Sequence, residues 1–329
     1  MIKKWMHMQL VSKNYWIIFM NPNNLKVTMR LVYQELQQRG IPVKILSTDP
    51  SLVEYQYREQ WHLLHSTLGE KEPAIAYAIA ENKTLTSVLS QKMGWPHPAS
   101  QQYNEANASQ FLEQYRPLAV KPLNGAHGNG ITLGVESDEQ LLKAVKHAEK
   151  FGKKVLLQQM VSGDDYRVLC IDGRYVAALK RIPACVKGDG IHSVRELIIQ
   201  ENKNPERGSN YSKALEYISL DTAKGFLGES IENIPLAGEV MQVVGVPNLG
   251  SGGRAEDKTD LIPEQMIDIA ISIAKKLKMG VCGVDFIWDG NDNLWVIEIN
   301  ANPGIDMHDD PKFGVPRGVI TALVDYLLV

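Results

Sequence analysis

The chain has 329 residues, 44% hydrophobic and 22% charged, which suits a globular protein of one large domain or two to three lobes. Its 35 basic and 38 acidic residues give a formal net charge of −3 without a basic stripe or an acidic block, so nucleic acid is not an expected partner. No run reaches the roughly 18 apolar residues of a membrane helix, and three widely spaced cysteines provide neither a disulfide framework nor a zinc site. We therefore expect a cytoplasmic protein with no membrane span.

The first 80 residues are predicted to form a small α/β lobe. The expected elements are a buried strand at 15–20 (YWIIFM), a helix at 25–39 and a strand at 41–46 (IPVKIL). This strand–helix–strand order is typical of an α/β arrangement. The pattern of residues 50–80 is less decisive, although EPAIAYAIA at 72–80 indicates the start of a helix or strand.

The middle of the chain is predicted to mix helices and strands. Helices are expected at 83–93, 137–152 and from about 193, and strands at 118–123, 131–135, 154–161, 166–171 and 175–182. Ser137 and Gln140 have the spacing of a capping box, and Asp172-Gly173 is typical of a tight hairpin turn. Residues 204–260 are rich in turn-forming residues and are predicted to be irregular.

The C-terminal part begins with an amphipathic helix at 262–280, which has Pro263 near its start. A strand hairpin at 281–288 and 294–300 follows, and a helix at 319–328 ends the sequence. Between them lies a loop that contains three prolines and three aspartates.

Three polar residues interrupt the apolar hairpin: Asp285, Glu298 and Asn300. Because side chains alternate along a strand, Glu298 and Asn300 share a face. A two-residue turn sets Asp285 against Val296, and a turn longer by two residues sets it against Glu298; both registers keep the three on one face. Such an oxygen cluster suits Mg²⁺, which prefers one or two carboxylates plus phosphate oxygens. A solvated polar face remains the alternative.

Residues 120–135 (VKPLNGAHGNGITLGV) indicate a strand, a glycine-rich loop and a strand. Gly125, Gly128 and Gly130 allow backbone N–H groups to approach phosphate oxygens, and the ammonium of Lys121 can reach the same phosphates. The spacing is neither that of a P-loop nor that of a Rossmann fingerprint. A glycine-rich hairpin without a ligand is the alternative.

Several motifs in order resemble the ATP-grasp superfamily, in particular the ATP-grasp parts of cyanophycin synthetases and bifunctional glutathione synthetases. They are NKTLT (82–86), VKPLNGAHGNGIT (120–132), SGDDYRVLCIDGRYVAALKRIPACVKGDG (162–190), NPERG (204–208), NLGSGGRAEDKTD (248–260), GVDFIW (283–288) and EINANPGIDMH (298–308). The resemblance covers about 250 residues, from about residue 80 to the end.

The resemblance implies an α/β fold of the α+β ATP-grasp type. It consists of an N-terminal α/β lobe at 1–80 and an ATP-grasp domain at 81–329, which contains a mobile lid lobe at about 97–160 and a C-terminal lobe with an antiparallel sheet. ATP is expected between the lobes, with one or two Mg²⁺ ions, or Mn²⁺ in their place.

Residue roles follow from the same resemblance. Lys83, Lys121 and the loop residues Gly125, His127, Gly128 and Gly130 would contact the phosphates. The side chain of Gln158 and the backbone of Gln159, Met160 and Val161 would face adenine, and Asp165 would accept from the ribose hydroxyls. Asp285, Glu298 and Asn300 would hold Mg²⁺.

The implied reaction is ATP-dependent joining of a carboxylate to an amine through an acyl phosphate, with Arg167 and Arg181 steadying that intermediate. The substrates would be amino acids or short peptides. The alternatives are an ATP-grasp kinase or carboxylase that forms no amide, and a nucleotide-binding protein without turnover. Base rates favour a homodimer.

Substrate recognition is expected to involve four further residues. Asn302, His308 and Arg317 match family positions near the site, although a structural role for His308 stays open. Arg254 brings positive charge into a loop where relatives often carry Thr or Asp, so we expect recognition to be rewired there. Gln158 also departs from the family, which commonly has Glu at this position, but a Gln oxygen can still accept from the adenine amino group.

Overall fold

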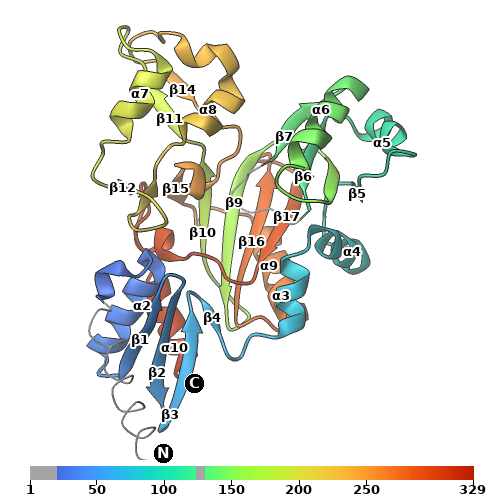
Figure 1. Ribbon diagram of the computed structural model, residues 1–329. Helices are drawn as coiled ribbons and strands as arrows, with labels where there is room; N and C mark the ends of the chain where they lie inside the picture. Colours follow the sequence, from blue (N-terminus) through green and yellow to red (C-terminus); the bar gives the residue numbers. More distant parts are fainter. Residues whose placement is uncertain (1–20, 124–129) are drawn as a thin grey trace, which may run out of the picture.

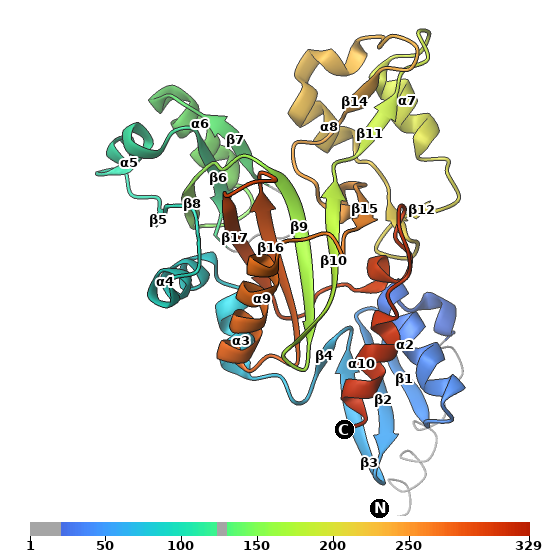
Figure 2. The same cartoon turned by 180° about the vertical axis from the view of Figure 1, so that it is seen from behind.

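The computed structural model describes residues 21–123 and 130–329. In these residues a five-stranded antiparallel sheet stands at the centre, and three smaller groups of elements surround it (Figures 1 and 2). This mixed α/β architecture with antiparallel sheets confirms the predicted fold class. No helix within the described ranges is long and apolar enough to cross a membrane.

The central sheet has the strand order β15–β10–β9–β16–β17. Its strands are β9 (Asp164–Ile171), β10 (Arg174–Ile182), β15 (Arg254–Asp257), β16 (Val281–Trp288) and β17 (Leu294–Asn300). The predicted hairpin at 281–300 is confirmed, and so is the turn that joins β9 to β10. Asp172 and Gly173 have φ angles of 53° and 66°, as a tight hairpin turn with this twist requires.

Helix α9 (Glu264–Leu277) covers one face of the central sheet, as the helical pattern of its sequence predicts. It packs against alternate residues of two strands, Tyr166, Val168 and Cys170 from β9 and Val284 and Phe286 from β16. Two shorter helices, α3 (Ala74–Ala80) and α4 (Lys83–Met93), pack beside β17. The predicted limits of α4 are confirmed: Asn82 caps its start, and Gly94 ends it in the left-handed conformation.

The N-terminal lobe contains a short 3₁₀ turn, one helix and a meander of strands. They are η2 (Pro22–Asn24), α2 (Val27–Gln38), β1 (Val43–Thr48), β2 (Ser51–Tyr57), β3 (Gln60–His65) and β4 (Leu68–Gly69). The predicted helix at 25–39 and strand at 41–46 are confirmed, whereas the strand expected at 15–20 lies outside the described residues. All pairings among β1 to β4 are antiparallel, so the undecided segment 50–80 supplies two hairpins and helix α3.

The two ends of the described chain share one hydrophobic core. Helix α10 (Val319–Leu327) packs against α2 and the meander, and Leu169, Ile171 and Val281 of the central sheet join the same cluster. The N-terminal lobe therefore covers the lower half of the sheet face that α9 leaves uncovered, with α10 beside it (Figure 1).

The lid group is the four-stranded antiparallel sheet β5–β8–β6–β7 with two helices. Its elements are β5 (Ser100–Gln102), α5 (Ala108–Tyr115), β6 (Leu118–Pro122), β7 (Thr132–Val135), α6 (Asp138–Ala148) and β8 (Val155–Gln159). The predicted capping box is present, with Ser137 and Gln140 bonded to each other's backbone N–H groups. The domain limits at 80 and at about 97–160 stay predictions.

The upper lobe, residues 184–244, has a hydrophobic core of its own. It contains β11 (Cys185–Lys187), α7 (Val194–Glu201), β12 (Arg207–Gly208), β13 (Leu215–Glu216), α8 (Leu220–Leu227), η3 (Gly228–Glu232) and β14 (Val240–Gln242). The prediction that 204–260 is irregular is therefore wrong for much of this segment, because short elements pack here without a long periodic pattern. The upper lobe and the lid group stand on either side of the upper end of the central sheet (Figures 1 and 2).

Candidate active site

The face of the central sheet opposite α9 is divided into an apolar and a charged half. Strand β9 shows the division along its length: Leu169 and Ile171 lie in the core shared with the N-terminal lobe, whereas Asp165 and Arg167 come earlier on the same face. We call the second half the charged face; it comprises Asp165, Arg167, Arg181, Asp285, Glu298 and Asn300. Because side chains alternate along each strand, the same sheet face carries buried core residues at one end and candidate active-site residues at the other.

Strand register aligns these side chains across the sheet. Asp285 lies opposite Arg167 on one side and Glu298 on the other. Of the two registers that the sequence left open, the structure has the one that pairs Asp285 with Glu298. A bulge follows this pair, and Phe286 is already opposite Val296. Asn300 lies opposite Gly283, which has no side chain to fill the space beside the amide.

Two arginines hold the carboxylate of Asp285. Arg167 donates from Nε to Oδ1 at 2.7 Å and from a terminal nitrogen to Oδ2 at 2.8 Å, and Arg181 lies 3.0 Å from Oδ2. Arg181 also donates to Asp165 at 2.5 Å. Burial opposes ionisation of Asp285, but the two guanidinium groups outweigh burial and lower its pKa to about 2. Burial raises the pKa of Asp165 to about 6, against the effect of Arg181.

Two lysines approach the same surface from different elements. Lys83, the first residue of α4, forms an ion pair with Glu298 at 2.9 Å. Lys121 on β6 is only 6% exposed and donates to Oε1 of Gln158 at 2.7 Å. Burial and, to a smaller extent, nearby Lys83 lower the pKa of Lys121 to about 8, with Glu298 partly offsetting both effects. The predicted phosphate lysines and the carboxylate of Glu298 are therefore within electrostatic reach of one another.

Gln158 links β6 to β5 in the lid group. Its oxygen accepts from Lys121, and its amide nitrogen donates to the hydroxyl of Ser100 at 2.9 Å. The side chain is 4% exposed. The oxygen expected to face adenine thus already has a protein donor, and a second lone pair is what remains for the nucleotide.

The chain leaves the lid group through Gln159, Met160 and Val161. The N–H of Met160 donates to the carbonyl of Pro117 at 2.9 Å, which fixes the first part of this connection. Gly163 follows with φ of 147°, and a Cβ atom there would lie 2.5 Å from the backbone of Trp288. Only glycine fits this contact, so the connection crosses tightly over the end of the hairpin.

Most of the glycine-rich loop lies outside the described residues, and so do the predicted phosphate contacts Gly125, His127 and Gly128. Gly130 is described. Its φ is 74°, and a Cβ atom would meet the ring of Phe151 at 2.7 Å. This position requires glycine for packing as well as for backbone conformation, which sequence spacing alone did not show.

The oxygen donors on the charged face fit a hard divalent cation. Asp285, Glu298 and Asn300 offer two carboxylates and an amide oxygen on one surface. The amide nitrogen of Asn300 is buried without a hydrogen-bond partner among the described residues, so this side chain is not fixed by another protein group there. Two carboxylates are too few for an all-protein Mg²⁺ cage, and they suit an ion that also binds phosphate oxygens.

The structure directs Arg254 away from the charged face. Arg317 is held by Asp257, which lies on the same sheet face as Arg167, because both are opposite Leu179 in the register. Arg254 lies opposite Ile182 in the sheet register, on the face away from Arg181, and its guanidinium pairs with Glu201 at 2.8 Å. Arg317 donates to Asp257 at 2.9 Å and pairs with Asp260 at 2.7 Å. The roles of both arginines in substrate recognition stay predictions.

Asn302 and His308 belong to the packing under the charged face. The oxygen of Asn302 accepts from both the N–H and the hydroxyl of Thr67 at 3.0 Å, which ties the N-terminal lobe to the loop after β17. His308 is fully buried, and neither ring nitrogen has a hydrogen-bond partner among the described residues. Burial, with a contribution from Arg167, lowers the pKa of His308 to about 3, so the ring is neutral.

Sequence reasoning missed Arg207, Glu201 and Asp257. Arg207 is 3% exposed, donates to the carbonyls of Glu216 and Gly252 and pairs with Glu201. Its only sequence signal was its place in the NPERG motif. Asp257 is buried and bonds Arg317 across 60 residues of sequence, a contact that no local pattern predicts.

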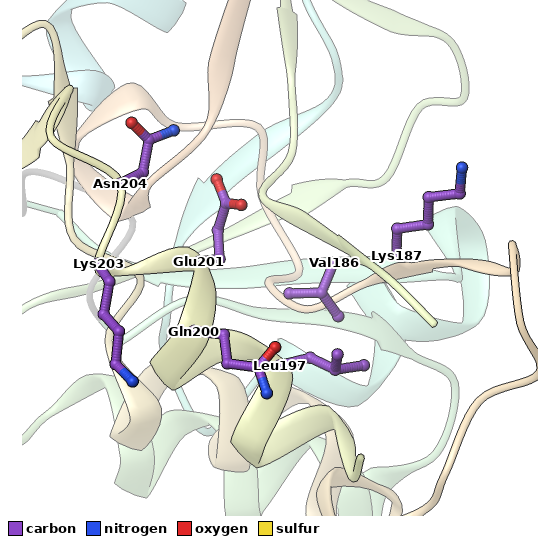
Figure 3. A pocket seen from close by; sticks show the side chains of 7 residues that line it. All are labelled: Val186, Lys187, Leu197, Gln200, Glu201, Lys203 and Asn204. Carbon is purple, nitrogen blue, oxygen red and sulfur yellow. The ribbon is translucent and has the colours of Figure 1, made fainter. Parts of the chain in front are cut away.

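A cavity of about 460 Å³ lies in the upper lobe between β11 and α7 (Figure 3). Its lining is Val186, Lys187, Leu197, Gln200, Glu201, Lys203 and Asn204. Both lysine side chains point outward in Figure 3, and none of the lining residues belongs to the charged face. The cavity is therefore separate from the candidate active site.

Two family models match the chain. Residues 96–191 match the ATP-grasp domain of prokaryotic glutathione synthetase, and residues 246–320 match the RimK-like ATP-grasp domain. The first match spans the lid group with β9 and β10, and the second spans β15, α9 and the β16–β17 hairpin. The charged face is assembled from both matched regions.

Curated proteins and solved structures give consistent likenesses. The cyanophycin synthetase of Trichormus variabilis is 31% identical over 314 residues, 90% of this chain and 34% of that protein. The glutathione biosynthesis bifunctional protein of Pasteurella multocida is 30% identical over 324 residues, 93% of this chain and 43% of that protein. The crystal structure of a bifunctional glutathione synthetase from Pasteurella multocida matches with a TM-score of 0.66 at 28% identity, covering 93% of this chain and 44% of that one. The chain spans between a third and a half of the length of these relatives.

Proposed function

We propose that this chain, two parts of which match ATP-grasp family models, is an ATP-dependent ligase that joins a carboxylate to an amine through an acyl phosphate. The observation that carries the proposal is the charged face. Arginines, lysines, carboxylates and an amide from β6, β9, β10, α4, β16 and β17 meet on one surface. Phosphoryl transfer depends chiefly on positioning and charge neutralisation, which such a surface supplies.

In this proposal Lys83 and Lys121 bind the phosphates of ATP. Lys121 is held by Gln158 at the end of β6, and Lys83 is held by Glu298. The connection from Gln159 to Val161 would face adenine, and Gly130 would contact the phosphates. Asp165, which pairs with Arg181, would accept from the ribose hydroxyls.

Asp285, Glu298 and Asn300 would hold Mg²⁺, which supplies charge neutralisation between the terminal phosphates. The protein side chains then position the reacting groups. The carboxylate of the acid attacks the γ-phosphorus, ADP leaves, and Arg167 and Arg181 neutralise the acyl phosphate. The amine attacks the acyl carbon and loses a proton, and phosphate departs to leave the amide.

We propose an amino acid or a short peptide as the acid, and an amine from the same class of compounds. The likeness to proteins named for the synthesis of cyanophycin and glutathione supports this choice. A homodimer stays a prediction.

The test is phosphate release from Mg·ATP across a matrix of acids and amines, with mass spectrometry of each positive mixture. The acids include γ-glutamylcysteine, free amino acids and aspartyl or glutamyl peptides, and the amines include glycine, cysteine, arginine and polyamines. We expect release that needs both partners and a product lighter than their sum by one water. Release with the acid alone in every case would refute amide formation.

Two lysine variants control the assay. Lys121→Met should abolish the coupled release, because a buried phosphate contact is lost. Lys143→Met should leave it unchanged, because Lys143 pairs with Glu139 on the exposed surface of α6. Equal activity of both variants would contradict the phosphate role of Lys121.

A further inference from the structure

Arg167 bonds the two oxygen atoms that a metal ion would need. Its side-on contact occupies Oδ1 and Oδ2 of Asp285 at 2.7 and 2.8 Å, and the Asp285 side chain is 3% exposed. Mg²⁺ binds carboxylate oxygen at about 2.0–2.1 Å. A guanidinium and a divalent cation on the same carboxylate would place like charges within a few ångströms, away from water, where repulsion is poorly screened. The two groups therefore compete for Asp285.

Charge balance on the charged face disfavours a free metal ion. Among the described residues, Lys83, Lys121, Arg167 and Arg181 lie with three carboxylates, those of Asp165, Asp285 and Glu298. Asp257 on the same sheet face is paired with Arg317, so the cationic side chains of this group remain in excess. A free divalent cation adds two more positive charges to this surface. The same ion bound to a nucleoside triphosphate brings a net negative charge, which the surface attracts.

The two arginines differ in what else holds them. Arg181 keeps its contact with Asp165 at 2.5 Å if it loses Asp285. Within the described ranges, every hydrogen bond and ion pair of the Arg167 side chain is to Asp285. Arg167 is therefore the arginine that loses its partner when a cation takes Asp285, and it can then turn to another anion.

We propose that Arg167 and the nucleotide-bound divalent cation exchange on Asp285. Arg167 excludes the free metal ion and is released toward the anionic acid group only when the metal–nucleotide complex has entered. This inference rests on the proposed function for the identity of the nucleotide and the acid. It makes metal binding conditional on nucleotide, and it couples acid binding to both through one side chain.

Binding of Mn²⁺, measured by electron paramagnetic resonance on the full chain without acid or amine, tests the exchange. We expect weak Mn²⁺ binding to the wild type alone and at least tenfold tighter binding with a non-hydrolysable ATP analogue. Arg167→Met removes the competitor, so it should bind free Mn²⁺ at least tenfold more tightly than the wild type. Adding Asp285→Asn to Arg167→Met should remove that gain.

Arg195→Met is the matched control, because Arg195 makes a similar two-nitrogen contact with Glu232 on the exposed upper lobe. It should bind Mn²⁺ as the wild type does. Arg167→Lys keeps the charge but cannot bond both oxygens of Asp285 side-on, so its affinity for free Mn²⁺ should be intermediate. If Arg167→Met does not fold, Arg167→Lys provides the test of the exchange.

Either of two results would overturn the exchange. One is equal Mn²⁺ affinity of the wild type with and without the nucleotide analogue. The other is free Mn²⁺ affinity in the Arg167 variants no higher than in the wild type. Failure of the chain to bind nucleotide at all would instead count against the proposed function, and the comparison of free Mn²⁺ affinity among the variants would still test the competition.

Discussion

Neutralising Asp285 should destabilise the protein. If repulsion between Asp285 and the neighbouring carboxylates dominated instead, the same substitution would stabilise it. Asp285 is 2% exposed and accepts from two guanidinium groups that are themselves largely buried. In Asp285→Asn one acceptor oxygen remains, and the new amide N–H groups face arginine donors. Removing one partner of a buried ion pair costs about 3–5 kcal/mol, because the other charge stays buried without compensation.

The cost is measurable as a shift in the urea midpoint of unfolding. With a slope of about 3 kcal/mol per M, a loss of about 3–5 kcal/mol lowers the midpoint by roughly 1–2 M. Hydrogen exchange of β9 and β16, followed by mass spectrometry, localises the effect to the central sheet and does not depend on whether the lobes unfold together.

Glu298→Gln is the matched comparison, because Glu298 is a predicted ligand of the same ion but is a third exposed. Its ion pair with Lys83 is of the kind that contributes about 0–1 kcal/mol. The midpoint should therefore fall by less than about 0.4 M. An unchanged or raised midpoint for Asp285→Asn, or equal losses in the two variants, would refute the claim that arginines hold the charged face together.

Three further outcomes are expected. Gly163→Ala should lower the free energy of unfolding by at least about 2 kcal/mol in thermal unfolding, because the new Cβ atom has no room. Gly225→Ala, in a helix with open space around it, should raise that free energy by about 0.5–1 kcal/mol. Equal effects of the two substitutions would contradict the tight crossing at Gly163. At pH 8.5, calorimetry in buffers of different ionisation enthalpy should show proton uptake on nucleotide binding, because the pKa of Lys121 is lowered to about 8 and phosphate raises it again; uptake should vanish at pH 6.5 and in Lys121→Met. Asn302→Ala should cost about 1–3 kcal/mol and speed proteolysis near Thr67 without changing nucleotide affinity, and a selective loss of substrate affinity would instead support the substrate role predicted from its motif.

The elements that carry the charged face were readable from the sequence because their signals are local. The hairpin at 281–300 consists of two apolar runs around a turn of Asp, Gly and Asn, and α4 has an Asn cap and a terminal glycine. Alternation alone put Asp285, Glu298 and Asn300 on one face. The register was decided by a bulge in β17, and a bulge leaves no sequence signal of its own in this segment.

What the sequence did not reveal depends on contacts between distant segments. Lys121 and Gln158 meet across paired strands, and Arg167 meets Asp285 across 118 residues of chain. Arg254 was expected at the substrate, but one residue of strand parity turns it to the opposite face, where Glu201 holds it. Motif resemblance places a residue near a site; its partners depend on the packing of the whole sheet.

The upper lobe shows a different limit. Its helices and strands are short, and a helix of about eight residues has too few turns to give a decisive period. A helix from about residue 193 was still predicted, and in the structure Ser193 and Glu196 form a capping box at the start of α7. The short strands β11 and β14 have no comparable local signal, and they depend on the common core of the lobe for their stability.

Oxygen transfer from acid to phosphate tests the central claim most directly. The acid identified in the substrate matrix is prepared with ¹⁸O in its carboxyl group and incubated with Mg·ATP and the amine. An acyl phosphate requires that one carboxyl oxygen attack phosphorus and leave with it, so the account predicts one ¹⁸O atom in each released phosphate. Phosphate free of ¹⁸O would mean that no acyl phosphate forms, and the proposal of a carboxylate–amine ligase would be wrong.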